Sequence, residues 1–334
     1  MVEDPRTTEN GKRSPAWRVL APFQYLRLSW TSLNEWLKAL LLAFAVLAFI
    51  HVFVLRWVTV RSSSMYSTLR EGDLIGVAHW PVWTGFHRGD IAVFHDPLHD
   101  DHAMPGRKLL VKRIVGLPGD KVELRDGKLF VNDNRLSEFE GETKSWMVRL
   151  KLGTEPSVIL HDLGLPPGSV PSEGTMIELP LNKAIAKEIL ARSDVVSAEP
   201  LPGAAGAPAH IFPFSPYFHW NSDDYGPITV PKRGDNVRID ATTVPMYDRI
   251  IGLYEGNKME NAGNDLLING VKSDHYTIQQ DYYFVLGDSR HYSADSRYWG
   301  FVPVDHLVGR ASFVLMSSDP EGDVRGDRWF KGLH

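Results

Sequence analysis

The feature that most constrains this chain is an apolar run, ALLLAFAVLAFIHVFVL, at residues 39–55. It contains a single polar residue, His51. As a helix it would be about 25 Å long, close to the ~30 Å thickness of the hydrocarbon core of a bilayer. Trp36 and Trp57 flank the run, where the aromatic side chains of membrane helices meet the interface. We therefore predict one transmembrane helix over residues 39–56.

Two other interpretations of this run are a buried core helix and a cleaved signal peptide. A signal peptide usually has a shorter apolar core that ends in a small-residue A-x-A site, and no such site follows this run. Nearby basic residues stand on both sides of it, so their positions leave the orientation open. These residues are Arg27, Lys38, Arg56, Arg61 and Arg70. We predict an uncleaved anchor preceded by a polar N-terminal tail, residues 1–38.

The composition excludes several classes of protein. With 334 residues, of which 43% are hydrophobic and 23% charged, the chain can form one large or two medium domains with buried cores. Its net charge of −5 and the lack of an Arg/Lys stripe argue against nucleic acid as a partner. The chain has no cysteine, which excludes disulfides, thiolate metal ligands and a cysteine nucleophile.

After Trp57 the sequence predicts a mainly β fold of antiparallel strands. Short β-branched runs alternate with Gly, Pro, Asn and Asp, as in GDIAVFH and KVELRDGKLFVN. The Asp-Gly pair of RDGK, residues 125–128, predicts a tight hairpin. The segment 261–274 repeats the pattern of 124–136, which indicates two hairpins of one sheet system.

The main β domain is predicted to comprise residues 57–136 and 281–318. Between these parts, residues 137–280 are predicted to form an inserted β-rich subdomain. It contains one short helix near 181–193, LNKAIAKEILARS, before a bend rich in Gly, Pro and Ala. The polar residues 319–334 are predicted to be a C-terminal surface tail.

Four serines stand close together in VTVRSSSMYSTLREGD, and one of them could be a nucleophile. They are Ser62, Ser63, Ser64 and Ser67. A nucleophilic serine usually takes a histidine as its base. None of the 13 histidines stands in a recognisable frame, and the segment around His291 has no G-x-S-x-G elbow. A lysine can replace histidine if it is neutral at the working pH.

Lys112 is the candidate for such a base. An exposed lysine has a pKa of about 10.4, and lowering this pKa to near 7 costs about 4 kcal/mol, mainly through burial. Side chains alternate between the two faces of a strand, so Leu110, Lys112 and Ile114 share one face in KLLVKRIVGLPGD. The two apolar neighbours would desolvate the amine. The alternative is a lysine that extends to solvent at a sheet edge.

Four segments, in this order, resemble the motif boxes of bacterial type I signal peptidases, also called leader peptidases. They are SSSMYSTLREGD, RGDIAVF, KRIVGLPGDKV and GDSRHYSADSRYWGFVPVDHLVGRA. An apolar anchor precedes the boxes, as it does in that family. The resemblance implies a membrane-anchored serine endopeptidase, with the main β domain as its catalytic ectodomain.

The resemblance also implies a role for each matching residue. Ser64, which precedes Met65, is the nucleophile, and Lys112 is its base. Ser62 and the backbone N–H of Ser64 form the oxyanion hole, and Ser293 orients the lysine. The charged positions that would support the site structurally are Asp288, Arg290, Asp295 and Arg297.

The chain departs from the family pattern in the serine box. Ser63 stands where Gly is usual, and Ser67 stands where Pro is usual. The first change adds a side chain to a tight loop, and the second removes a fixed φ angle. Neither replaces a chemical group.

The implied reaction removes signal peptides from secretory preproteins after small residues at positions −1 and −3, through an acyl-enzyme on Ser64. Shallow apolar pockets suit such residues, and the expected lining residues are Val60, Met65, Leu69, Leu110 and Val111. We expect no cofactor and no metal. Residues 95–102 include metal-ligand residue types, but their polar, Pro-containing sequence is that of a solvated loop.

Signal peptides are cut after translocation in that family. The resemblance therefore implies a single-pass protein of the bacterial cytoplasmic (inner) membrane, with residues 1–38 in the cytoplasm and the catalytic domain on the extracytoplasmic side. Membrane lipid is then a second partner, and Trp80, Trp83 and Phe86 are either core residues or a surface that contacts it. Two alternatives remain: a Ser-Lys protease with a dedicated substrate, and an inactive membrane-tethered scaffold of the same fold.

Overall fold

The computed structural model of the chain describes residues 34–50, 54–99, 102–166, 168–201, 210–262, 265–319 and 322–333. The chain divides into two compact units, residues 1–53 and 54–334. Most of the predicted N-terminal tail, residues 1–33, lies outside the described residues.

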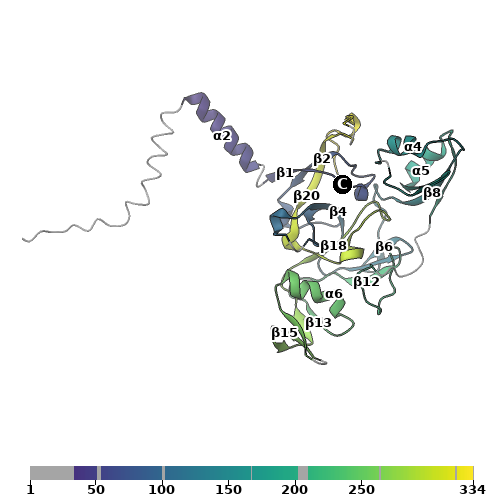
Figure 1. The fold of residues 1–334 in the computed structure, drawn as a ribbon. Coiled ribbons are helices and arrows are strands. Elements are labelled where there is room, and N and C mark those ends of the chain that lie inside the picture. The colour runs from purple at the N-terminus through teal and green to yellow at the C-terminus, as the bar shows by residue number, and fades with distance from the viewer. Residues whose placement is uncertain are drawn as a thin grey trace, which may run out of the picture. The chain divides into compact units, whose positions relative to one another are not determined.

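The first unit contains helix α2 (Glu35–Phe49) (Figure 1). The side chain of Asn34 caps it by accepting a hydrogen bond from the N–H of Trp36 at 3.1 Å. Within the described residues, no helix combines the length and the apolar character needed to cross a membrane. Positions 55 and 56 of the predicted transmembrane helix belong to a strand instead, because they pair with Ala78 and Val77 of the next strand.

Seven antiparallel strands form the largest sheet of the second unit, in the spatial order β1-β2-β20-β3-β4-β18-β19. The long strand β20 comes from the end of the chain and lies between β2 and β3, so the two predicted parts of the main domain build one sheet (Figure 1). The prediction of a mainly β, antiparallel fold is confirmed. The strands are β1 (Leu55–Thr59), β2 (Asp73–Ala78), β20 (Leu307–Ser317), β3 (Ile91–His95), β4 (Leu109–Gly116), β18 (Tyr282–Leu286) and β19 (Val302–Pro303).

Apolar side chains of this sheet divide between separate clusters, as strand alternation requires. In β4, Leu110 and Ile114 pack in one cluster with Phe94. Leu109 and Val111 pack in another, which contains much of the apolar core beneath β1 and β2. The alternation predicted for the strand that carries Lys112 is therefore present.

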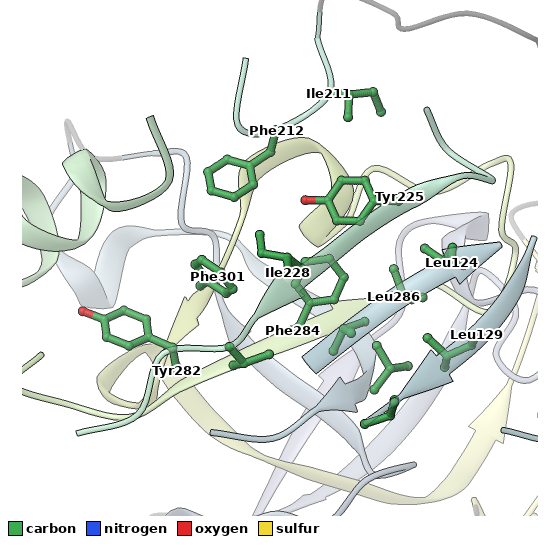
Figure 2. Close-up of a cluster of buried hydrophobic side chains, with 14 of the residues drawn as sticks. Leu124, Leu129, Ile211, Phe212, Tyr225, Ile228, Tyr282, Phe284, Leu286 and Phe301 are labelled. Atoms are coloured by element: carbon green, nitrogen blue, oxygen red, sulfur yellow. The ribbon is translucent and has the colours of Figure 1, made fainter. Parts of the chain in front are cut away.

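A second sheet has the order β12-β5-β6-β7. Its strands are β12 (Tyr225–Thr229), β5 (Lys121–Arg125), β6 (Lys128–Val131) and β7 (Asn134–Arg135). Asp126 and Gly127 join β5 to β6 with φ angles of 52° and 64°, as a type I′ turn needs, so the predicted hairpin is confirmed. Figure 2 shows the core between this sheet and β18, where Tyr225, Ile228 and Phe284 pack together.

A separate four-stranded sheet, β11-β8-β10-β9, lies within the predicted insertion. Asn182 caps helix α5, where its side chain accepts from the N–H of Ile185 at 2.9 Å, inside the range predicted for a helix. These elements enclose their own apolar core. We call residues 144–200 the inserted subdomain. Its elements are β8 (Lys144–Leu150), α4 (Pro156–Leu163), β9 (Ser172–Glu173), β10 (Met176–Leu181), α5 (Lys183–Leu190) and β11 (Val195–Pro200).

The rest of the predicted insertion does not belong to this subdomain. Strand β12 returns to pair with β5, and Ile228 and Ile250 join the core of the main domain. The single insertion 137–280 is therefore two separate excursions. The second contains β13 (Asn236–Arg238), α6 (Val244–Asp248), η4 (Arg249–Tyr254), β14 (Met259–Ala262), β15 (Asp265–Ile268), β16 (Val271–Lys272) and β17 (His275–Thr277). Strands β14, β15 and β16 form a meander like β5, β6 and β7, but the two meanders belong to separate sheets, so the expectation of one sheet system is wrong.

The C-terminal segment is packed against the main sheet, contrary to the predicted surface tail. Arg328, in the short helix η6 (Gly326–Arg328), is buried and pairs with the Asp73 carboxylate at 2.9 and 2.5 Å. Its Nη2 also donates to the carbonyl of Thr68 at 3.0 Å. Leu333 packs in the core beneath β1 and β2. The polar composition of this segment suggested a solvated tail, but the buried ion pair between Arg328 and Asp73 holds the segment against the sheet.

Candidate active site

Ser64 lies in the short 3-10 helix η2 (Ser63–Met65), between β1 and β2, and is 7% exposed. Its carbonyl accepts a hydrogen bond from the N–H of Ser289 at 3.1 Å. This contact joins the loop of the predicted nucleophile, residues 62–69 and called the nucleophile loop below, to the last motif box. The two segments are far apart in the sequence, so the fold brings them together.

Lys112 lies within β4, next to Ala92 of β3, and is 4% exposed. Its Nζ is 2.5 Å from Ser64 Oγ. Burial lowers the pKa of Lys112 from 10.5 to about 8, against the opposing effect of the Asp295 and Asp288 carboxylates. The structure thus places a buried amine with a lowered pKa within hydrogen-bond distance of a serine hydroxyl.

Ser62 stands beside the same hydroxyl. Its Oγ is 3.2 Å from Ser64 Oγ. Ser62 is exposed and has an extended backbone, with φ −149° and ψ 155°. Its hydroxyl can therefore reach both the Ser64 side chain and an incoming group.

Ser293 is buried near these residues, but it does not contact the lysine. Its Oγ donates to the carbonyl of Ala294 at 3.3 Å, and within the described residues it makes no hydrogen bond to Lys112. A Cβ on Gly287 would lie 2.1 Å from Ser293 Oγ and 2.5 Å from the Ser64 carbonyl oxygen. A side chain at position 287 would therefore clash with both Ser64 and Ser293, so this position requires glycine. The sequence analysis missed Gly287, although it begins the last motif box.

Three buried ion pairs surround the site and contain all four predicted support residues. Their charged groups are paired, which reduces the cost of their burial. The pairs are Asp288 with Arg113 at 2.8 and 2.7 Å, Arg290 with Glu142 at 2.8 Å, and Asp295 with Arg297 at 2.9 and 2.8 Å. Sequence reasoning missed two partners. The sequence offered a clue to Arg113, because it is a charged residue beside Lys112 in an apolar β-strand. It offered no clue to Glu142.

Two of these pairs also bond to the segments around Ser64. Asp288 accepts a hydrogen bond from Thr68 Oγ1 at 2.5 Å, which fixes the nucleophile loop from its far end. Asp295 accepts from the N–H of Gly287 at 3.0 Å and caps helix α7 (Ser296–Trp299). The carboxylates therefore hold the Thr68 side chain and the Gly287 backbone near Ser64.

The inserted subdomain also supports the nucleophile loop. Tyr66, two residues after Ser64, is 1% exposed and packs inside the core of that subdomain with Ile159 and Leu160. Its hydroxyl donates to the Leu163 carbonyl at 3.1 Å, and its own carbonyl accepts from Thr143 Oγ1 at 3.2 Å. Burial raises the pKa of Tyr66 to about 12, so the phenol stays a donor at neutral pH.

A groove of about 550 Å³ opens beside Ser62 and runs between β1 and β4. Both strands have a free edge there, because β1 is the last strand of its sheet and β18 pairs with β4 only from Arg113 onward. The residues that line the groove are Arg56, Trp57, Val58, Thr59, Val60, Arg61, Ser62, Met65, Lys108, Leu109, Leu110 and Val111.

Four of the five predicted pocket residues line this groove: Val60, Met65, Leu110 and Val111. Leu69 is the exception, because its side chain is fully buried in the core beneath β1 and β2. Its N–H donates to the Met65 carbonyl at 2.8 Å, which turns the loop and its side chain inward. Leu69 is therefore a core residue rather than a pocket residue.

The aromatic segment after β2 separates into two environments. Trp80 and Trp83, at the short helix α3 (Pro81–Thr84), are 44% and 68% exposed. Phe86 is buried and packs edge-on against Tyr283. Of the two interpretations of this segment, Phe86 therefore fits the core, and the two tryptophans form an exposed surface.

Comparisons with known proteins bear on the family of the chain. A sequence model of the family described as "Signal peptidase, peptidase S26" matches residues 33–155 and 167–316. Signal peptidase IB of Staphylococcus aureus (strain N315) is 34% identical over 107 residues, which are 32% of this chain and 52% of the relative. Signal peptidase I of Bacillus licheniformis is 34% identical over 108 residues, 32% of this chain and 54% of the relative.

The chain spans about half the length of the curated relatives it matches. Among solved structures, a signal peptidase I from Enterococcus faecalis V583 is 18% identical to it, with a TM-score of 0.25. That comparison covers 68% of this chain and 97% of the other.

Proposed function

Because the chain belongs to the family Signal peptidase, peptidase S26, we propose that it is a serine endopeptidase that removes signal peptides from secreted preproteins. The observation that carries the proposal is the buried contact between Lys112 Nζ and Ser64 Oγ. A buried lysine with a lowered pKa beside a serine is the arrangement that a Ser-Lys reaction requires.

The reaction begins when neutral Lys112 takes the proton of the Ser64 hydroxyl as Oγ attacks the scissile carbonyl. The Ser62 hydroxyl and the Ser64 N–H donate to the oxyanion that forms. Lys112 then gives its proton to the leaving amine, and an acyl-enzyme ester remains on Ser64. Lys112 next takes a proton from water, whose oxygen attacks the ester carbon. The bond between this carbon and Ser64 Oγ then breaks, Oγ takes the proton back from Lys112, and the signal peptide leaves with a new carboxylate.

The groove offers a place for the residues before the scissile bond. An extended substrate segment can hydrogen bond to the free edges of β1 and β4, and its alternate side chains then point the same way. Val60, Met65, Leu110 and Val111 provide apolar contacts that suit small residues at −1 and −3. Ser293 remains a proposed positioning residue for Lys112. In this role the Ser293 hydroxyl would have to rotate away from the Ala294 carbonyl, to which it donates.

We further propose that the chain is anchored in the bacterial cytoplasmic membrane, with its catalytic part on the extracytoplasmic side. Helix α2 supports this, because its leucines and phenylalanines are exposed and favour contact with lipid. The exposed Trp80 and Trp83 also suit a membrane interface.

The detergent-solubilised full chain tests the proposed function on a preprotein with an A-x-A site. We expect cleavage after the second alanine, and a loss of at least ~10³-fold in rate for Ser64→Ala. Ser63→Ala is the matched control, since Ser63 lies in the same helix and its side chain makes no hydrogen bond among the described residues. Uncut preprotein, or full activity of Ser64→Ala, would contradict the proposal.

The pKa of Lys112 predicts the pH dependence of the reaction. Only the neutral amine accepts the Ser64 proton, and its fraction rises tenfold per pH unit until the pKa of about 8 is reached. We therefore expect kcat/KM to rise about tenfold per unit below this pH and to level off above it. Initial rates on an uncharged peptide from about pH 6 to about 10 measure this. A rate that is flat below pH 8 would exclude Lys112 as the base.

A further inference from the structure

Three basic residues line the groove beside Ser62: Arg56, Arg61 and Lys108. Arg61 and Lys108 are exposed, and Arg56 is partly exposed. Within the described residues, none of the three forms an ion pair, whereas Arg113, Arg290 and Arg297 near the site do. The other residues that line the groove are apolar or uncharged. The groove thus carries three unneutralised positive charges over an apolar surface.

Building on the proposed function, we propose that these cations select preproteins with an acidic side chain shortly before the cleavage site. The free carboxylate of such a side chain would neutralise charges that no described residue neutralises. The apolar surface of the groove still accepts the small residues at −1 and −3.

The strand geometry indicates which substrate positions are involved. Lys108 precedes Lys112 by four residues, about 13 Å along an extended strand. A bound substrate in extended form covers the same distance in about four residues. Lys108 therefore lies beside position −4 or −5, and Arg56, which is farther from Ser64 along β1, lies at the same end of the groove. Arg61 is closer to the nucleophile and lies beside position −2 or −3.

The expected size of the substrate preference follows from the solvent exposure of the groove's cations. An ion pair between exposed groups changes binding by a factor of roughly 1.4 to 5, and salt screens it. With two cations near position −4, we expect about a tenfold difference in kcat/KM between peptides with Glu and with Lys there. The difference should fall to below about twofold near 1 M salt, where the screening length is about 3 Å.

Three peptides that share one A-x-A site and carry Glu, Gln or Lys at −4 test the proposal on the full chain in neutral detergent. We expect the order Glu, Gln, Lys in kcat/KM at low salt, and a loss of most of this difference for Lys108→Glu, because the new carboxylate offsets the charge of Arg56. Lys187→Glu is the matched control, because Lys187 is exposed on α5, outside the groove, and should leave the order unchanged.

The outcomes separate this proposal from the proposed function. Equal cleavage of all three peptides would overturn the acidic preference while leaving signal-peptide cleavage intact, and failure to cut any of them would refute both. Equal cleavage of the three peptides, together with binding to phosphatidylglycerol vesicles that Lys108→Glu weakens, would assign the cations to lipid headgroups instead, which also overturns the proposal.

Discussion

Replacing Lys112 with methionine is expected to abolish cleavage and, at pH 7, to stabilise the folded chain. The loss of the base should reduce kcat by at least about 10²- to 10⁴-fold. Methionine has a similar length and no charge, so it fills the same buried position without the cost of desolvating an amine. An enzyme that is more stable without its base would indicate that Lys112 is kept for chemistry.

The sign of the stability change follows from the pKa. Burial lowers the pKa of Lys112 from 10.5 to about 8, so the unfolded chain binds more protons between these values. The contribution of Lys112 to stability is therefore fully present above about pH 10.5 and is lost as the pH falls to about 8. At pH 7 the substitution should add up to roughly 3 kcal/mol to the free energy of unfolding.

Urea unfolding of the two proteins at pH 7 and near pH 10 measures this difference, which should shrink at the higher pH. Lys187→Met is the control, because that lysine is exposed and its loss should change stability little at either pH. A Lys112→Met protein that unfolds more easily at pH 7, or that retains cleavage, would contradict the assignment.

Removing the Asp288 carboxylate should be among the most destabilising single changes in the main domain. Asp288→Ala removes the carboxylate that pairs with the buried Arg113 guanidinium, whose side chain is 2% exposed. Breaking a buried ion pair in this way typically costs about 3–5 kcal/mol. Thr68 loses its hydrogen-bond partner at the same time, so cleavage should fall in the protein that remains folded.

Asp133→Ala is the comparison for this change. Asp133 forms an ion pair of 2.6 Å with Lys121, but its side chain is 64% exposed, so its loss should cost less than about 1 kcal/mol. Urea unfolding compares both variants with the parent chain. The double variant Arg113→Met/Asp288→Leu should recover part of the stability, because neither charge is then left alone. Equal, small effects of Asp288→Ala and Asp133→Ala would show that the buried pair contributes little.

Local sequence patterns predicted the parts of the fold that local physics determines. The Asp-Gly turn at 125–128 and the alternation around Lys112 both depend on neighbours in the sequence, and both are present. The division of residues 137–280 was not predictable in this way. It depends on β12 pairing with β5, about a hundred residues away, and no short pattern records that pairing.

The site shows the same division. The resemblance selected Ser64 and Lys112, and strand alternation gave a reason for the burial of the lysine. The partners of the support residues stayed hidden, because Asp288 pairs with Arg113 and Arg290 with Glu142 across long stretches of chain. Leu69 was misplaced for a related reason, since an apolar residue after the nucleophile suits a pocket and a core equally well.

The burial of Tyr66 in the inserted subdomain has a consequence for how this protein can change. A side chain two positions from the nucleophile completes the hydrophobic interior of a segment that begins at residue 144. Deleting that segment would expose the phenol ring of Tyr66 and remove the Leu163 carbonyl that accepts from its hydroxyl. The subdomain therefore cannot be removed without a cost to the loop. The nucleophile loop and the inserted subdomain therefore depend on each other, and a chimera with another peptidase would have to exchange both together.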